Sequence, residues 1–363
     1  MRKFLTTLTA LTLVGGVLLG APARTLAAGG SADYWISTAS VGAGTSCASP
    51  THQYDATNTN KRFNDLLDLI LADVDAENYA SVTIAICDAD NGAEQAYEMD
   101  GDTDATDDVS GAEITILGVQ WDATSASDVA GPGDIVIDGD ADYSPFEFNN
   151  ADVYIGYLTI DNAFDNNTGA GIHFSDTTLG FIYELTLDHV VINDAYLASG
   201  DGAGVYAAGG NVTITDSTFT DNSADNGSGG AVYVADAVSV TISDSVFGNP
   251  NDDSFGNFAD NYGGDIYVTG GGALADLSIS NSQFYDAYAE DESGGSIAAI
   301  CAASVISGVT IRGAESDDDG AGLYFNDDSG CGADYTVTVT NSRFLNNDAD
   351  YQGGAISDGQ DDS

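Results

Sequence analysis

Short segments in which apolar and polar residues alternate recur along the second half of the chain. Four of them share one pattern, in which the alternation ends in Asn/Asp-Ser and a Phe: VTITDSTF from Val212, VTISDSVF from Val240, LSISNSQF from Leu277 and VTVTNSRF from Val337. A period of two is typical of half-buried β-strands, and Asn/Asp-Ser marks a turn before the Phe. We expect a fifth, degenerate copy, VTIRGA, from Val309. Each copy therefore predicts a strand, a turn and a second short strand.

A glycine phrase, Gly-small-x-aliphatic, lies between these segments and recurs seven times. Several copies carry a second glycine (Gly230, Gly264, Gly354) or continue with an aromatic residue (Tyr206, Tyr233, Tyr267, Tyr324). The phrase begins at Gly169, Gly202, Gly229, Gly263, Gly294, Gly320 and Gly353, with a mean spacing of about 31 residues.

Repeats of this length, built from short strands without a long helix, cannot bury their apolar side chains alone and must stack. Stacking predicts an all-β parallel β-helix in which equivalent Val, Ile and Phe side chains form ladders about 4.8 Å apart. The long and variable rungs favour the right-handed form. A propeller would need blades of about 40–45 residues, and a β-sandwich would not repeat one phrase seven times.

The N-terminal third is less regular and predicts one helix over residues 61–74, which we expect to cap the open end of the solenoid. Strands are expected over 82–86, 113–119, 134–138 and 153–160, about a rung apart. The organisation is then a signal peptide (1–28), a cap with the first rungs (29–150) and the repeat region (151–363). Because the sequence stops just after the last glycine phrase, we expect it to be truncated or to lack a C-terminal cap.

The first 28 residues have the features of a secretory signal. Arg2 and Lys3 precede an interrupted apolar run over 4–19, and small residues follow over 21–28. No later segment is long and apolar enough to span a membrane.

The four cysteines fit an oxidising compartment. Four cysteines allow three pairings, of which we favour Cys47–Cys87 and Cys301–Cys331 because each pair is close in sequence. Closing loops of that size would stabilise the fold by roughly 3–4 kcal/mol each.

Charge narrows the class of partner. The chain has 58 Asp and Glu against 7 Lys and Arg, a formal net charge of −51. This balance excludes nucleic acid and anionic lipid surfaces as partners. The hydrophobic share of 43% nevertheless argues for a packed core rather than a disordered acidic chain. Aspartate, a turn residue, supplies 49 of the 58 acids, so we expect an acidic coat over an apolar core, balanced by high salt or by calcium.

Calcium is the one cofactor that the sequence suggests. Two Asp-x-Asp-x-Asp runs mimic the start of an EF-hand loop, but both lack its Gly at the sixth and its Glu at the twelfth position. The candidate ligands are Asp100, Asp102, Asp104, Asp138, Asp140 and Asp142.

Two motifs together resemble the repeats of polymorphic outer membrane proteins and related right-handed parallel β-helix proteins. GGA-aliphatic occurs at Gly229 and Gly353, and F-x-x-N occurs as Phe219 with Asn222 and as Phe344 with Asn347. Further F-x-x-N copies are expected from Phe164 and Phe258. The resemblance covers roughly residues 150–363 and implies display at the cell surface or outer membrane.

Parallel β-helices also host pectate lyases and polygalacturonases, a likeness of fold alone. A lyase needs an Arg or Lys that acts as a catalytic base beside calcium-binding carboxylates. We instead expect Arg312 to be a surface residue that forms loose salt bridges with the acids at 315–319, and Arg343 to be solvated. His173 and His189 are expected to face solvent or cap turns. We therefore expect a secreted or cell-surface, non-catalytic protein that acts in adhesion or in envelope or matrix contacts, with polysaccharide or protein ligands. The alternative is a polysaccharide lyase or glycoside hydrolase on the same fold.

Overall fold

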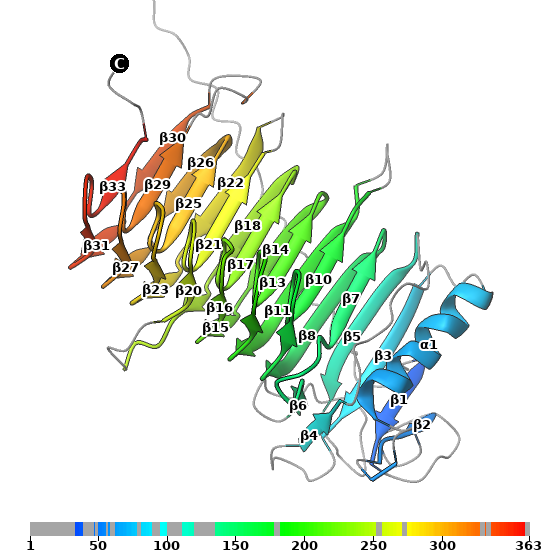
Figure 1. The fold of residues 1–363 in the computed structure, drawn as a ribbon. Coiled ribbons are helices and arrows are strands. Elements are labelled where there is room, and N and C mark those ends of the chain that lie inside the picture. The colour runs from blue at the N-terminus through cyan, green and yellow to red at the C-terminus, as the bar shows by residue number, and fades with distance from the viewer. Residues whose placement is uncertain are drawn as a thin grey trace, which may run out of the picture.

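The chain winds into a coil of stacked rungs, with the single described helix at its N-terminal end (Figure 1). The computed structural model describes residues 33–38, 47, 50–55, 57–58, 62–77, 81–88, 95–99, 111–119, 135–177, 182–251, 256–270, 274–326, 331 and 335–359.

Three parallel sheets run along the coil. The long sheet contains β1 (Tyr34–Ser37), β2 (His52–Gln53), β3 (Ser81–Cys87), β4 (Gln95–Glu98), β5 (Glu113–Val119), β6 (Ile135–Asp138), β8 (Asp152–Asp161), β11 (Glu184–Asn193), β14 (Asn211–Thr215), β15 (Thr218–Thr220), β18 (Ser239–Ser243), β19 (Val246–Phe247), β22 (Ala275–Ser280), β23 (Gln283–Tyr285), β26 (Ala302–Ser307), β27 (Thr310–Arg312), β30 (Val337–Thr340) and β31 (Arg343–Leu345).

The other two sheets are narrower. The eight-stranded sheet contains β7 (Phe146–Asn149), β10 (Ile172–Ser175), β13 (Val205–Ala208), β17 (Val232–Ala235), β21 (Ile266–Thr269), β25 (Ile297–Ile300), β29 (Leu323–Asn326) and β33 (Ile356–Ser357). The seven-stranded sheet contains β9 (Phe164–Asp165), β12 (Tyr196–Leu197), β16 (Ser223–Ala224), β20 (Phe258–Ala259), β24 (Tyr288–Ala289), β28 (Glu315–Ser316) and β32 (Asp348–Ala349).

Identical side chains stack on one another in the core, as the repeated pattern predicts. Phe219, Phe247 and Phe284 pair in register on β15, β19 and β23 and are fully buried. Their ring centroids lie 4.8 and 4.9 Å apart. Stacking along the coil therefore buries side chains that one rung would leave exposed.

Turns between the strands need left-handed backbone, and the repeats supply residues that tolerate it. The first glycine of all seven phrases has a φ between 63° and 79°. Asp216, Asp244, Asn281 and Asn341, which follow the alternating strands, have φ values of 47–53°. Gly, Asn and Asp adopt this conformation at the least steric cost, so the turn signals in the sequence are confirmed.

The Asn of F-x-x-N serves the inside of a corner. Asn222 is fully buried; its Oδ1 accepts a hydrogen bond from the Ala195 amide at 3.1 Å and its Nδ2 donates to the Ile192 carbonyl at 3.1 Å. Asn347 makes the equivalent two hydrogen bonds near the C-terminal end of the coil. Its Oδ1 accepts from the Ala314 amide and its Nδ2 donates to the Ile311 carbonyl. The copies expected from Phe164 and Phe258 are out of phase, because those residues lie on β9 and β20 of the seven-stranded sheet.

The segment from Val309 is not the degenerate strand copy that we expected. Strand β26, over Ala302–Ser307, pairs with β22 and takes that place in the rung. Thr310 and Ile311 instead pair with Gln283 and Phe284, the second short strand of the copy before. The alternation is the same in both strands, so its period alone could not fix which strand it belonged to.

The helix α1 (Phe63–Glu77) lies beside the first rungs, close to the bounds that the pattern predicts. Phe63, Leu67 and Ile70 are buried in the same core as the strands. The Phe63 ring contacts Phe146 at 5.8 Å between centroids, edge to face. Apolar residues at helical spacing therefore place one face of this helix on the solenoid core.

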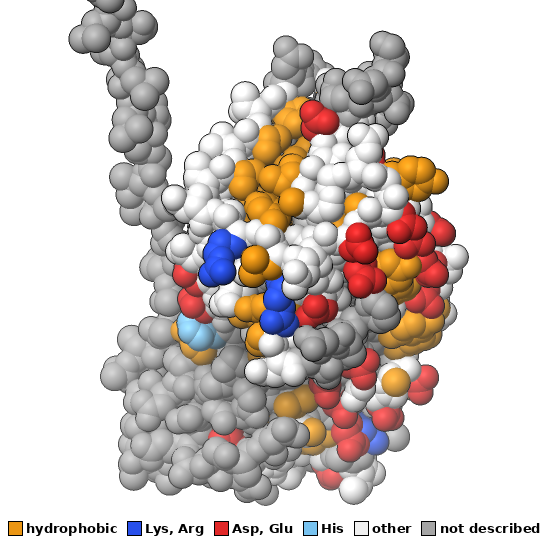
Figure 2. Space-filling model, turned by 90° about the vertical axis from the view of Figure 1, so that its left-hand side faces the viewer, with side chains coloured by type: hydrophobic (Ala, Val, Ile, Leu, Met, Phe, Trp, Pro, Cys, Tyr) orange, Lys and Arg blue, Asp and Glu red, His pale blue; other side chains and the backbone are white. Residues whose placement is uncertain are grey.

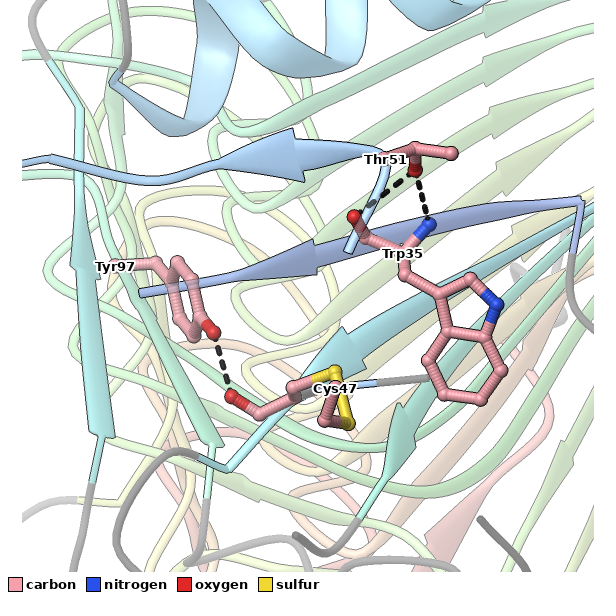
Figure 3. Close-up of a disulfide and its surroundings, with 5 residues drawn as sticks. Trp35, Cys47, Thr51 and Tyr97 are labelled. Atoms are coloured by element: carbon pink, nitrogen blue, oxygen red, sulfur yellow. Dashed lines mark hydrogen bonds between the residues drawn. A yellow bond between two sulfur atoms is a disulfide. The ribbon is translucent and has the colours of Figure 1, made fainter. Parts of the chain in front are cut away.

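Both favoured disulfides are present. Cys47 and Cys87 have Cα atoms 5.6 Å apart, and Cys301 and Cys331 have Cα atoms 5.1 Å apart. Figure 3 shows the first bond between Trp35 and Tyr97, whose hydroxyl donates to the Cys87 carbonyl at 2.5 Å. The disulfide and Trp35 belong to a small second core on the outer side of β3 and β5.

The last described rung leaves core positions open. Val337 is 37% exposed and Ile356 is 41% exposed, whereas Val212 and Val240, at the position of Val337 in earlier rungs, are fully buried. Figure 2 looks onto this end of the coil and shows hydrophobic side chains gathered on it. Within the described residues, no helix has the length and apolar character needed to cross a membrane.

Candidate functional site

A row of tyrosines crosses the outer face of the eight-stranded sheet. Tyr206 on β13, Tyr233 on β17 and Tyr267 on β21 pair in register. Their ring centroids lie 5.3 and 5.2 Å apart, with interplanar angles of 4° and 24°. The register of a parallel sheet therefore brings one aromatic ring per rung into a continuous stack.

A fourth tyrosine, from a turn, carries the row past a gap. On β25 the next position is Ala298, which is fully buried, and on β29 it is Tyr324. Tyr262, which directly precedes a glycine phrase, lies 5.6 Å from the Tyr267 ring and 6.1 Å from the Tyr324 ring. We call the five residues Tyr206, Tyr233, Tyr267, Tyr262 and Tyr324 the tyrosine ladder.

A histidine borders the N-terminal end of the tyrosine ladder. His173 on β10 pairs with Tyr206, and its ring meets the Tyr206 ring edge to face at 5.1 Å. Burial lowers the pKa of His173, against the opposing influence of Glu147 and Asp165. The imidazole therefore favours the neutral form at physiological pH.

The ladder rings are half-buried, apart from Tyr324, which is buried. Because the rings turn their faces toward one another, their edges and hydroxyl groups form the surface that a ligand would meet. Burial, and after it the charge of Asp201, raises the pKa of both Tyr206 and Tyr233. Burial and Glu292 raise the pKa of Tyr262. The hydroxyls therefore stay neutral and can both donate and accept hydrogen bonds.

Carboxylates flank the tyrosine ladder. Asp201 and Asp236 are close enough to act on the Tyr206 and Tyr233 hydroxyls. Burial raises the pKa of Asp201, and its Oδ1 accepts a hydrogen bond from the Ser228 amide at 2.8 Å. The surface thus combines neutral hydroxyls with negative charge, which disfavours anionic ligands.

The structure describes one of the two calcium candidates. Asp138 ends β6, and its Oδ1 accepts the amide of Asp140 at 2.9 Å, so its carboxylate supports its own turn. Asp140 and Asp142 are exposed. Asp100, Asp102 and Asp104 lie outside the described residues, and calcium binding at either run stays a prediction.

The two arginines differ in their surroundings. Arg312, which we expected to lie among the acids at 315–319, lies 3.5 Å from Asp286 on the neighbouring rung and 5.1 Å from the centre of the Tyr285 ring. Register between rungs brings these two residues next to it. Arg343 is exposed and pairs with Thr310, in line with the expected variable surface position.

Sequence reasoning found part of this site and missed the rest. Tyr206, Tyr233, Tyr267 and Tyr324 stood out as aromatic residues that follow a glycine phrase, but their union into one row needs the register. Tyr262 was missed because it precedes its phrase. One signal could have identified Tyr262. It is an aromatic residue at an irregular offset, and it lies one rung before Ala298, which interrupts the series of tyrosines that follow the glycine phrases.

The comparisons with known proteins agree with the topology. Residues 203–361 match the model of the family described as "Right handed beta helix region". No curated protein and no solved structure gives a significant match. Together with the parallel pairing of the three sheets, the family match confirms the expected fold class, an all-β right-handed parallel β-helix.

Proposed function

We propose that this protein is exported and acts without catalysis, by binding an extended, neutral polysaccharide along the tyrosine ladder at a cell surface or in an extracellular matrix. The observation that carries the proposal is the continuous row of five rings across neighbouring rungs. A row that repeats with the rung, about every 4.8 Å, suits a ligand that is itself a linear repeat.

Tyrosine is suited to such a surface for two reasons. Its side chain has few rotatable bonds, so little conformational entropy is lost when a ligand binds. Its hydroxyl can bond to sugar hydroxyls while the apolar body of the ring adds contact area. In this ladder neighbouring rings already hold one another, which reduces the entropy cost further.

Charge supports a neutral ligand. The carboxylates of Asp201 and Asp236 border the ladder, and the whole chain carries a formal charge of −51. A uronic polysaccharide would meet repulsion along its entire length. Neutral glucans, xylans and mannans would not.

Three features support the surface setting. The two disulfides fit an oxidising compartment, and residues 1–28 have the pattern of a secretory signal. The GGA-aliphatic and F-x-x-N motifs resemble the repeats of polymorphic outer membrane proteins. We further propose that residues 29–150 and 151–363 form one continuous domain, with α1 as the cap of its N-terminal end.

Affinity electrophoresis in gels that contain one soluble polysaccharide each tests the proposal. The expected result is that at least one neutral glycan slows the migration of the protein, whereas polygalacturonate does not. Tyr233→Ala, in the middle of the ladder, should weaken binding about fivefold or more, since truncating an aromatic anchor at an interface costs more than about 1 kcal/mol. Tyr351→Ala, at a tyrosine that is 77% exposed and outside the ladder, is the matched control and should bind as wild type does.

The same samples test the alternative of an enzyme. Release of reducing ends, or of unsaturated uronates, by the pure protein would replace the binding proposal with a hydrolase or lyase. Unchanged migration of wild type in every neutral glycan, or equal retardation of Tyr233→Ala and wild type, would also refute it.

A further inference from the structure

A second cluster, on the long sheet, lies apart from the tyrosine ladder. Strand β11 bends at His189, whose φ is 56°, and the bend in the next rung lies at Asp216, with a φ of 47°. The register pairs Asp188 with Thr215 and Val191 with Thr218, so His189 and Asp216 are neighbours across the rungs. The topology thus places an imidazole next to two carboxylates at one corner of the coil.

The three side chains lie within reach of one ion. Oδ1 of Asp188 is 2.6 Å from Nδ1 of His189. One ligand atom from each of Asp188, His189 and Asp216 can be chosen so that all three lie within 4.8 Å of one another. Asp188 is buried, His189 is half-buried and Asp216 is exposed, so the cluster has a protein side and an open side.

Neighbouring residues hold the buried carboxylate in place. The Tyr154 hydroxyl donates to Oδ2 of Asp188 at 2.6 Å, and the Thr215 hydroxyl donates to Oδ1 at 3.3 Å. The Tyr157 ring stacks on the His189 ring at 4.8 Å, with an interplanar angle of 15°. Hydrogen bonds to ligating carboxylates and fixed ring orientation are the second layer that metal sites use to position their ligands.

The occupants of this corner differ between rungs. Tyr157 and His189 have φ values of 62° and 56°, whereas the following rungs place Asp216, Asp244 and Asn281 there. Bulky residues at such φ values are uncommon and carry a steric cost. Tyr157 and His189 therefore occupy a turn position that the following rungs fill with Asp or Asn, which adopt this backbone conformation at lower cost.

We propose that Asp188, His189 and Asp216 bind one divalent transition-metal ion of the zinc type, with solvent completing the coordination. One nitrogen and two oxygen ligands suit Zn²⁺ or Co²⁺, whereas Ca²⁺ prefers oxygen ligands alone. A tetrahedral ion about 2.0–2.1 Å from each ligand would place ligand atoms about 3.4 Å apart. The Asp188 and His189 ligand atoms therefore move apart by under about 1 Å as the ion comes between them, and a proton carried on Nδ1 passes to solvent.

Cobalt reports directly on the site, because its visible absorption depends on the ligands. The experiment titrates Co²⁺ and then Zn²⁺ into the metal-free full chain in about 1 M NaCl, where a screening length of about 3 Å suppresses loose attraction to the acidic coat. The expected result is one ion per chain, with a visible band that Zn²⁺ displaces.

The variants are chosen so that the turn survives. His189→Asn and Asp216→Asn put an amide where Asn281 and Asn341 occupy the same corner in other rungs, with φ values of 52° and 53°. Each should abolish the band or weaken Co²⁺ binding more than tenfold. Tyr154→Phe should weaken it about 10–100-fold through the lost hydrogen bond to Asp188.

Asp244→Asn is the matched control, since Asp244 occupies the same corner one rung further on, with a φ of 52°. It should leave the Co²⁺ band and affinity unchanged. The proposal is overturned if wild type shows no saturable band, or if Asp216→Asn binds Co²⁺ as tightly as Asp244→Asn while both have the far-UV circular dichroism of wild type.

Discussion

A carboxyl group inside the solenoid makes the stability of this protein depend on pH. Asp265 is fully buried at the third position of a glycine phrase, where Ala231 and Ser296 stand in the neighbouring rungs. Its Oδ1 accepts a hydrogen bond from Asn257 Nδ2 and its Oδ2 accepts one from Ser296 Oγ, both at 2.8 Å. Two neutral donors do not replace the hydration of a carboxylate.

The magnitude follows from the pKa. Burial, with a smaller contribution from Asp286, raises the pKa of Asp265 from its ordinary value of 3.8 to about 7. Since burial penalises the ionised form, the contribution of Asp265 to stability is greatest where its carboxyl is protonated, and this contribution is lost as pH rises from about 4 to about 7. A shift of about 3 units corresponds to about 4 kcal/mol at pH 8, at 1.36 kcal/mol per unit.

Asp265→Asn tests this reasoning, because the amide keeps the shape and never ionises. Its oxygen accepts from Asn257, and its NH₂ group can donate to Ser296, as the protonated acid would. We expect the variant to be more stable than wild type by up to about 4 kcal/mol at pH 8, on the order of 5 °C in Tm. At pH 4 the two should differ by less than about 1 kcal/mol.

The assay is thermal unfolding of both proteins from pH 4 to pH 8 in constant, molar NaCl. Only the difference between the two Tm values is used, because the other acids titrate equally in both. A difference that stays constant with pH, or a variant that is less stable than wild type at pH 8, would refute a buried, high-pKa carboxyl at this position.

Four further outcomes follow from the packing, the turns, the disulfides and the charge. Phe247→Ala should cost about 3–5 kcal/mol in guanidinium unfolding, since the ring is fully buried in its ladder, and a loss below about 1 kcal/mol would contradict that burial. Gly229→Ala should lower the free energy of unfolding by about 1–2 kcal/mol, because its φ is 67° and a Cβ would meet a backbone oxygen at 2.5 Å. Gly308→Asn should leave that free energy nearly unchanged. Replacing both Cys301 and Cys331 by Ser should cost roughly 3–4 kcal/mol for a loop of 30 residues, with an unchanged Tm as the contrary result. Tm should rise between low and molar NaCl, since salt screens the repulsion within a charge of −51, and a flat or falling Tm would exclude that repulsion as a limit on stability.

The repeat made the architecture predictable, because each rung uses the same residues for the same physical task. Val212 and Val240 had to face the core together, and Gly229 had to turn the chain. The pattern failed where alternation alone was ambiguous, as at Val309, and where a motif matched out of phase, as at Phe258. Register and phase depend on contacts with the neighbouring rungs.

The site was less predictable than the fold, since its parts come from different rungs. Tyr262 joins the ladder from a turn, where the strand series itself has Ala298 in place of a tyrosine. Asp216 meets His189 only through the register of β11 and β14. Single residues at irregular offsets carry no periodic signal, so only the assembled coil brings them together.

Hydrogen–deuterium exchange with and without a neutral oligosaccharide tests the ligand-binding face most directly. The ligand is the glycan that retards the protein most in affinity electrophoresis. Binding along the tyrosine ladder predicts that the ligand slows exchange in peptides that contain β13, β17 and β21. Exchange in peptides that contain β14, β18 and β22 of the long sheet should be unchanged. Protection confined to the long sheet, or equal protection in Tyr233→Ala, would contradict it.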